Sequence, residues 1–170
     1  MSWHWAAWGI GGLLGLGALI YGVGAALPRE HVAQVEVLLP ASPAHVASIV
    51  RDVEAQPRWR RDVRAIEVRQ KEKNAVRYVE RSRQADIAFE LIEEEPGRRF
   101  RSLITDQSLP FGGYWTFLLS PEGEGTRLRI EEHGVVKTPI FRFVSRFVLG
   151  HEATLRSYVE DMEKAVAVPR

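Results

Sequence analysis

The chain has 170 residues, of which 23 are Lys or Arg, 22 are Asp or Glu and none is Cys, and 45% are apolar. This length and apolar content are typical of one folded domain, and they argue against general disorder. The net charge of +1 argues against a nucleic-acid partner, and the lack of cysteine excludes disulfides, zinc fingers, iron–sulfur clusters and thiol catalysis.

The first predicted element is an uncharged run at residues 6–27. As a helix, these 22 residues would be roughly 33 Å long, close to the ~30 Å hydrocarbon layer of a bilayer. No Lys or Arg precedes the run, which argues against the alternative, a cleaved signal peptide. Residues 1–28 are therefore predicted to be a single-pass membrane anchor. Arg29 is the only Lys or Arg close to either end, and it favours a cytoplasmic location for residues 29–170.

Small residues recur along one side of this expected anchor. Gly11 and Gly15 are four residues apart, a spacing that would let a second helix approach closely and form a homodimer. The alternative is that small residues are simply common in membrane helices. The anchor residues with an expected role are Trp8, Gly11, Gly15, Leu19 and Tyr21, of which the aromatic ones would lie at the two membrane interfaces.

After the anchor, residues 31–39 alternate in polarity and predict a strand. Ser42 is the expected N-cap of a short helix, with Pro43 in the first helical position. The chain breaks again near Pro57, before the basic run at residues 58–61.

Between residues 63 and 132 the apolar period becomes two, which predicts six strands joined by short turns such as Glu95–Arg98. Residues 138–166 return to a helical period and predict one long helix on the sheet. The expected fold class is therefore α+β, with an antiparallel sheet of about seven strands and a long C-terminal helix.

Three stretches of the domain resemble the START-like superfamily, also called SRPBCC, which includes polyketide cyclase/dehydrase, coenzyme Q-binding and lipid-transfer domains. They are residues 42–63 with Trp59, residues 110–115, and the glycine turn and strand at residues 123–132. The resemblance covers residues 31–168 and implies a helix-grip fold, in which a curved sheet wraps around the terminal helix. Arg61 departs from the pattern, because many relatives carry proline there.

The resemblance also implies a cavity between sheet and helix for a hydrophobic small molecule or lipid. The expected lining residues are Trp59, Phe89, Phe100, Trp115, Phe117, Phe143, Phe147, His151 and Leu155. Aromatic residues at these periods are often only core, and a cavity of several hundred Å³ would distinguish the two cases.

His151 is the most specific candidate for polar chemistry. It would bind the polar head of a ligand, or a neighbouring side chain would satisfy it. The sequence from His151 begins like the zinc motif H-E-x-x-H, but Leu155 stands at the second ligand position, so no metal or cofactor is expected. The basic run around Trp59 would bind an anionic head group or form a solvated loop.

These patterns favour a membrane-tethered domain that binds a hydrophobic or lipid-like molecule and has no catalytic site. Two alternatives stay open. One is a cyclase- or dehydratase-type enzyme in which His151 or Tyr158 moves a proton. The other is a module without ligand that assembles with other membrane proteins.

Overall fold

A computed structural model describes the backbone of residues 3–83, 85–149 and 152–167 and the side chains of residues 15–83, 85–147 and 152–167. Helix α1 (Trp3–Ala26) extends away from a domain built on one seven-stranded antiparallel sheet. Its strands are β1 (Glu30–Leu39), β2 (Val63–Lys71), β3 (Ala75–Ser82), β4 (Asp86–Glu95), β5 (Arg99–Ile104), β6 (Phe111–Glu122) and β7 (Gly125–Val136). The expected sheet is thus confirmed.

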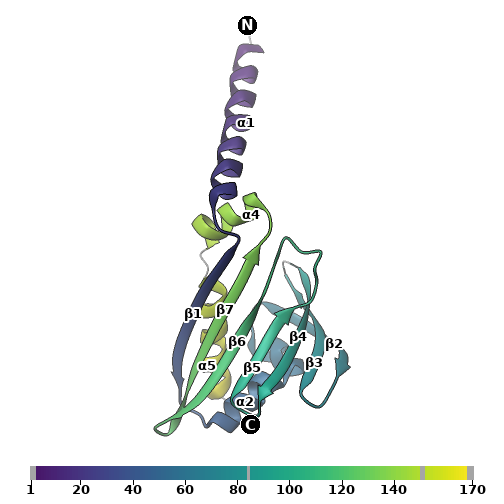
Figure 1. The fold of residues 1–170 in the computed structure, drawn as a ribbon, viewed down its shortest axis with the longest axis vertical. Helices are drawn as coiled ribbons and strands as arrows, with labels where there is room; N and C mark the ends of the chain where they lie inside the picture. Colours follow the sequence, from purple (N-terminus) through teal and green to yellow (C-terminus); the bar gives the residue numbers. More distant parts are fainter. Residues whose placement is uncertain (1–2, 84, 150–151, 168–170) are drawn as a thin grey trace.

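The strands follow the order β1-β7-β6-β5-β4-β3-β2, so β1 and β2 form the two edges (Figure 1). The connection between these edge strands contains α2 (Pro43–Arg51), the 3₁₀ turn η1 (Val53–Ala55) and α3 (Gln56–Trp59). Ser42 caps α2 as predicted, since its side chain accepts a hydrogen bond from the His45 N–H at 3.3 Å. Gly97 in the β4–β5 hairpin and Gly123 in the β6–β7 hairpin have φ values of 67° and 57°, a conformation that glycine adopts without strain.

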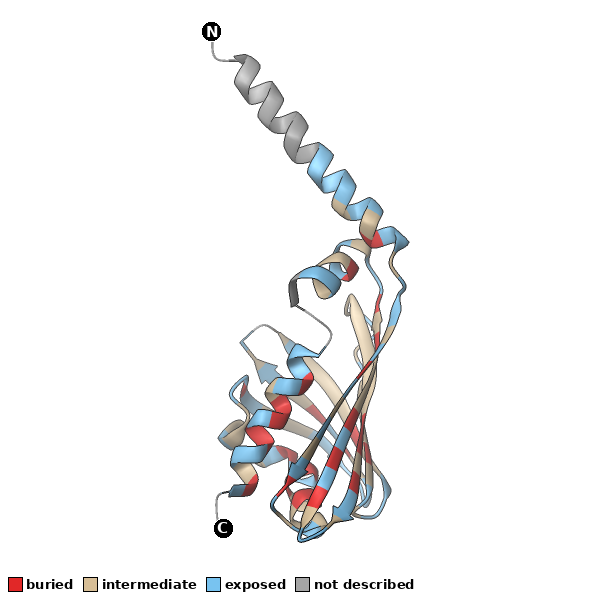
Figure 2. Ribbon diagram, turned by 90° about the vertical axis from the view of Figure 1, so that its left-hand side faces the viewer, coloured by how far each residue is buried: buried red, intermediate tan, exposed pale blue. Residues whose placement is uncertain are grey.

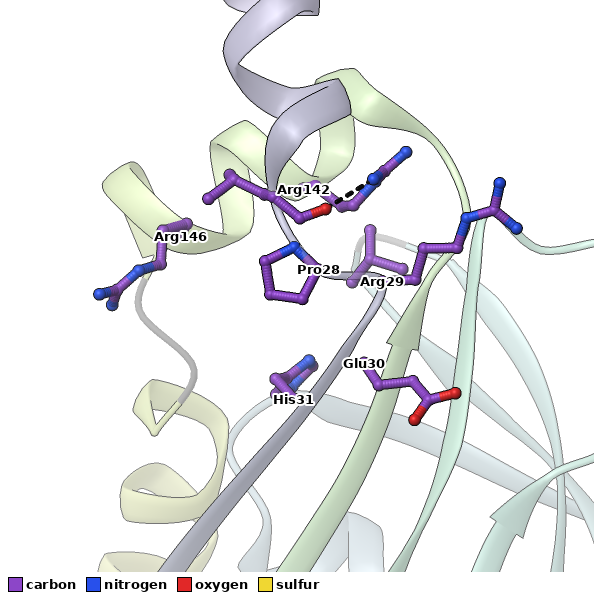
Figure 3. Close-up of a pocket in the computed structure, with 8 residues that line it drawn as sticks. Pro28, Arg29, Glu30, His31, Arg142 and Arg146 are labelled. Carbon is purple, nitrogen blue, oxygen red and sulfur yellow. Dashed lines mark hydrogen bonds between the residues drawn. The ribbon is translucent and has the colours of Figure 1, made fainter.

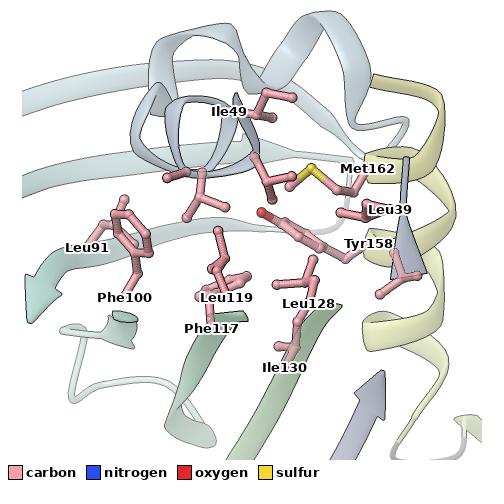
Figure 4. Packing of buried hydrophobic residues seen from close by; sticks show 14 of the residues in the cluster. Leu39, Ile49, Leu91, Phe100, Phe117, Leu119, Leu128, Ile130, Tyr158 and Met162 are labelled. Carbon is pink, nitrogen blue, oxygen red and sulfur yellow. The ribbon is translucent and has the colours of Figure 1, made fainter. Parts of the chain in front are cut away.

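One face of the sheet, here called the inner face, packs on α2 and on the C-terminal helix α5 (Ala153–Ala167) (Figure 2). Strand side chains alternate between this face and solvent, as the two-residue period predicts. The most completely buried side chains meet where α2, α5 and the sheet converge (Figure 4). They are Leu39, Val46, Phe100, Leu128, Ile130, Leu155 and Met162.

The predicted C-terminal helix on the sheet is confirmed in α5, but its predicted extent over residues 138–166 is wrong. The structure has α4 (Pro139–Val144), the π-helical turn η2 (Ser145–Leu149) and then α5 as separate elements. Gly150, a poor helix former, follows η2 in the sequence. Of these three elements, α5 lies against the sheet core, whereas α4 packs beside α1 (Figure 2).

The predicted membrane anchor is also overturned. Within the described residues, no helix is long and apolar enough to cross a membrane. Seven of the twelve residues from Gly15 to Ala26 are Gly or Ala, whose side chains add little apolar surface. The predictions of a membrane location and of a cytoplasmic domain behind an anchor are therefore wrong.

The end of α1 is held against α4. Arg142 on α4 donates from Nη1 to the carbonyl oxygens of Leu27 at 2.7 Å and Ala25 at 3.3 Å. A Cβ atom at Gly24 would lie 2.0 Å from the Pro139 carbonyl oxygen, so only glycine permits this approach. Of the predicted anchor residues, Leu19 and Tyr21 are exposed, and Gly15 has no heavy atom within 4 Å of an added Cβ. The side chains of Trp8 and Gly11 lie outside the described residues.

Candidate functional site

The inner face has a sealed end and a less covered end, which the register of β6 and β7 locates. Phe117 pairs with Ile130 and both are buried, under α2 and α5. Two residues further along each strand, towards α4, Trp115 pairs with Glu132 and both are only half-buried. Burial thus falls from complete to partial within two residues of β6 and β7, and the inner face becomes accessible at this position.

An aromatic cluster forms around Tyr158 of α5 at this boundary. Its ring centroid lies 5.3 Å from that of Trp59, 5.7 Å from that of Trp115 and 5.5 Å from that of Phe117. Burial raises the pKa of the Tyr158 phenol, so the hydroxyl stays protonated at neutral pH. The Trp59 indole N–H is buried, and no acceptor for it exists among the described residues. This donor is thus available to a bound molecule.

A buried polar network borders the aromatic cluster. Arg60 Nη1 donates to Gln56 Oε1 at 2.7 Å and to Glu80 Oε2 at 2.6 Å, while its guanidinium carbon lies 5.4 Å from the Tyr158 ring centre. Gln56 and Glu80 are themselves buried. The Tyr78 hydroxyl is hydrogen-bonded to Ser102 and Gln56, and burial raises the pKa of Tyr78 to about 12.

A second polar group, His31 with Glu132, lies on the inner face nearer to α4. The imidazole Nε2 is 3.5 Å from the Glu132 Oε1. Burial lowers the pKa of His31, which favours the neutral imidazole. His31 also lines a hollow of about 100 Å³ between β1, β7 and α4, shown in Figure 3.

Two hollows in the described part of the chain are both small. The one beside His31 measures about 100 Å³, and another between α2, β3 and β4 measures about 150 Å³. Sites for drug-sized molecules usually enclose about 300 to 1,000 Å³. Neither hollow reaches the several hundred Å³ that would separate a preformed ligand cavity from a packed core.

The predicted lining residues fall into different environments. Trp59, Trp115 and Phe117 meet at Tyr158, and Phe89 stacks on Tyr78 with ring centroids 5.7 Å apart. Phe100 and Leu155, in contrast, are completely buried in the sealed core.

The expected residues after β7 lie elsewhere. Phe143 and Phe147 pack on each other at 5.0 Å, and Phe147 is 60% exposed. His151 lies outside the described residues.

Sequence reasoning missed four polar residues of the site, His31, Gln56, Glu80 and Glu132, whereas it included Arg60 in the basic run at residues 58–61. A signal for two of them was present. Glu80 and Glu132 follow Tyr78 and Ile130 by two residues, so each carboxylate occupies the inward phase of an otherwise apolar strand. Charged residues at inward positions are expensive to bury without partners, and they therefore indicate polar contacts.

Residues 30–167 match the family model described as polyketide cyclase / dehydrase and lipid transport. The chain belongs to this family. A search of curated proteins finds no match. Several solved structures share the fold of this family member at low sequence identity. A shared fold at low identity does not identify the ligand.

Three of these structures illustrate the range of proteins that share the fold. A START superfamily protein from Mycobacterium smegmatis is 19% identical with a TM-score of 0.61, and the alignment covers 80% of this chain and 97% of that one. A STAR-related lipid transfer protein from Xanthomonas axonopodis is 19% identical with a TM-score of 0.60, covering 81% and 86%. The Zhui aromatase/cyclase from Streptomyces sp. R1128 is 11% identical with a TM-score of 0.66, covering 81% and 93%.

Proposed function

We propose that this member of the polyketide cyclase/dehydrase family binds a small hydrophobic or lipid-like molecule on the inner face of its sheet. The observation that carries the proposal is the incomplete burial of Trp59, Phe89 and Trp115, next to a core in which Phe117 is sealed. Large apolar side chains left partly open on an inner face gain free energy when a ligand covers them.

Two further features support this function. The buried Trp59 indole N–H, without an acceptor among the described residues, can donate a hydrogen bond to a ligand. The family description includes lipid transport, and one structural neighbour is a STAR-related lipid transfer protein. Because the hollows are smaller than such ligands, binding displaces side chains at the α4 end of the inner face.

The test uses N-phenyl-1-naphthylamine, a neutral apolar probe that fluoresces when it leaves water. In a Trp3→Phe/Trp5→Phe/Trp8→Phe background, the remaining tryptophans are Trp59 and Trp115. We expect saturable probe fluorescence and energy transfer from these two residues.

Phe89→Glu places a charge on the inner face and should weaken probe binding at least about tenfold, since a buried unpaired charge is costly. Ala88→Glu, the adjacent position on the opposite face of β4, is the matched control and should bind as the parent does. Absence of saturable binding, or equal loss in both variants with unchanged melting curves, would refute the proposal.

A cyclase- or dehydratase-type reaction is the second candidate. The observation in its favour is that burial keeps the phenols of Tyr78 and Tyr158 protonated, so either can donate a hydrogen bond to a substrate carbonyl. One structural neighbour is an aromatase/cyclase. Turnover of a poly-β-ketone substrate separates this candidate from simple binding.

A further inference from the structure

Strand β1 is one edge of the sheet, and no other strand lies on its outer side among the described residues (Figure 1). Directly before β1, the Arg29 carbonyl oxygen accepts a hydrogen bond from the Val136 N–H at 2.7 Å, in line with the β1–β7 register. Hydrogen-bonded pairs alternate along an antiparallel ladder, so the odd-numbered residues of β1 bond to β7. The backbone N–H and C=O groups of the even-numbered residues, from Glu30 to Leu38, therefore point away from the sheet.

The two edges of the sheet differ in how they are protected against pairing with another chain. The opposite edge, β2, has two shifts of register and carries Arg64, Arg69 and Lys71, and α3 packs against it. Bulges, cationic side chains and covering elements are features that prevent such pairing. In β1, the ten residues pair with β7 without a shift, and none of them is Pro, Lys or Arg. Only β2 is thus protected against an added strand.

The outer face of β1 also carries exposed apolar side chains. Val32 is 68% exposed and Leu38 is 56% exposed, and among the described strand residues these are the large apolar side chains that stay exposed. Gln34 and Glu36 lie between them on the same face. A strand that pairs with β1 would cover both apolar side chains, which is favourable.

The even-numbered residues of β1 are complementary to themselves in one antiparallel register. A twofold axis at Val35 places Val32 of each copy opposite Leu38 of the other. It also places Gln34 opposite Glu36, where the amide can donate to the carboxylate. Each of these pairs exchanges two backbone hydrogen bonds and occurs twice, so the interface would contain about eight, close to the usual number of about ten.

The neighbouring registers lack this complementarity. A shift of two residues in one direction places Val32 opposite Glu36, and the same shift in the other direction places Glu36 opposite its own copy, where like charges repel. A shift of one residue places outward-pointing backbone groups opposite groups that already bond to β7. In the favoured register, Arg127 of the same copy balances the charge of Glu36.

We propose that two copies of this chain associate by antiparallel pairing of their β1 strands about a twofold axis at Val35, which joins the two sheets into one. The occupant of this edge is therefore a second copy of the chain. The inference is independent of the proposed ligand binding, because the pairing uses the backbone edge and the outer face, whereas the ligand would lie on the inner face.

Sedimentation velocity of the full chain over a range of concentrations measures this association. We expect a concentration-dependent species of twice the mass of the chain. Val32→Lys introduces a cation into the interface twice and should raise the dimer dissociation constant at least about tenfold. Leu19→Lys, at an apolar position of α1 that is 63% exposed, is the matched control and should leave the dissociation constant unchanged. Melting curves establish that both variants are folded.

Disulfide cross-linking tests the register, because the chain has no cysteine of its own. Val32→Cys/Leu38→Cys should form disulfide-linked dimers in oxidised glutathione, since opposite residues of a hydrogen-bonded pair have Cα atoms about 5.5 Å apart, within the range of a disulfide. In either single variant the two cysteines would lie roughly 20 Å apart, at about 3.4 Å per residue, and should not cross-link on non-reducing gels.

Three results would overturn the proposal. The first is an unsubstituted chain that stays monomeric up to about 100 μM. The second is a dimer that Leu19→Lys weakens and Val32→Lys does not, because such a dimer would form through α1. The third is cross-linking of either single-cysteine variant to the same extent as the double variant.

Discussion

Removal of the Glu80 carboxylate should destabilise the domain far more than removal of a surface charge. Glu80 accepts from Arg60 at 2.6 Å and 3.3 Å, and the two side chains are 10% and 16% exposed. In Glu80→Ala the guanidinium stays buried with Gln56 as its remaining charge-assisted partner. Breaking a buried pair in this way costs about 3–5 kcal/mol, and the residual exposure of Arg60 places the expected loss near 3 kcal/mol.

Urea unfolding followed by tryptophan fluorescence measures this loss, and a fall in Tm of about 10 °C should accompany it for a chain of this size. The matched control is Arg77→Ala, which breaks a pair at 2.8 Å whose arginine side chain is 56% exposed. Exposed pairs contribute about 1 kcal/mol or less. A loss in Glu80→Ala within 1 kcal/mol of that in Arg77→Ala would contradict the reasoning.

The double variant Arg60→Met/Glu80→Leu separates pairing from packing. If the large loss in Glu80→Ala comes from an unpaired buried charge, replacing both partners by apolar residues should restore most of the stability. Full recovery is not expected, because Arg60 also lies over the ring of Tyr158 at 5.4 Å.

Gly24→Ala should loosen α1 from α4 and cost about 1–3 kcal/mol, because the new methyl group would lie 2.0 Å from the Pro139 carbonyl oxygen. Gly22→Ala meets nothing within 4 Å and should be neutral or stabilising, and urea midpoints compare the two. Stability should fall as the pH rises from about 10 to about 12, because the unfolded chain releases the Tyr78 proton near its ordinary pKa while the folded chain holds it to about 12. Tyr78→Phe should flatten this slope in unfolding measurements across that range.

The sheet could be predicted from the sequence because one face is buried in the core and the other faces water. Alternation along residues 31–39 matches β1 at Glu30–Leu39, and the glycine turn near residue 123 forms the β6–β7 hairpin. The N-cap at Ser42 likewise depends only on residues close in the sequence. In each case the physical cause lies in residues that are close in the sequence, so the sequence pattern is enough to predict the local structure.

The C-terminal segment was harder because its helical period continues through a break. Phe147 falls on the predicted inward stripe, yet it is 60% exposed, since η2 follows α4, which packs beside α1. The size of the hollows is equally invisible to the sequence, because volume depends on how side chains from distant elements interlock. The pattern of Trp115 and Phe117 is the same whether the interior is filled or open.

The two ends of the inner face differ in what their side chains contribute to stability. At the α2 end, Leu128 and Phe100 are completely buried and the apolar surface contributes to stability. Nearer α4, the wall carries His31, Glu132 and bare glycine backbone, a set of groups that stabilises the fold poorly. A chain selected only for stability would fill that end with apolar side chains, as it has done two residues away at Phe117 and Ile130. The two ends of this strand pair therefore differ in kind: one end contributes apolar burial to stability, and the other carries polar groups and small residues.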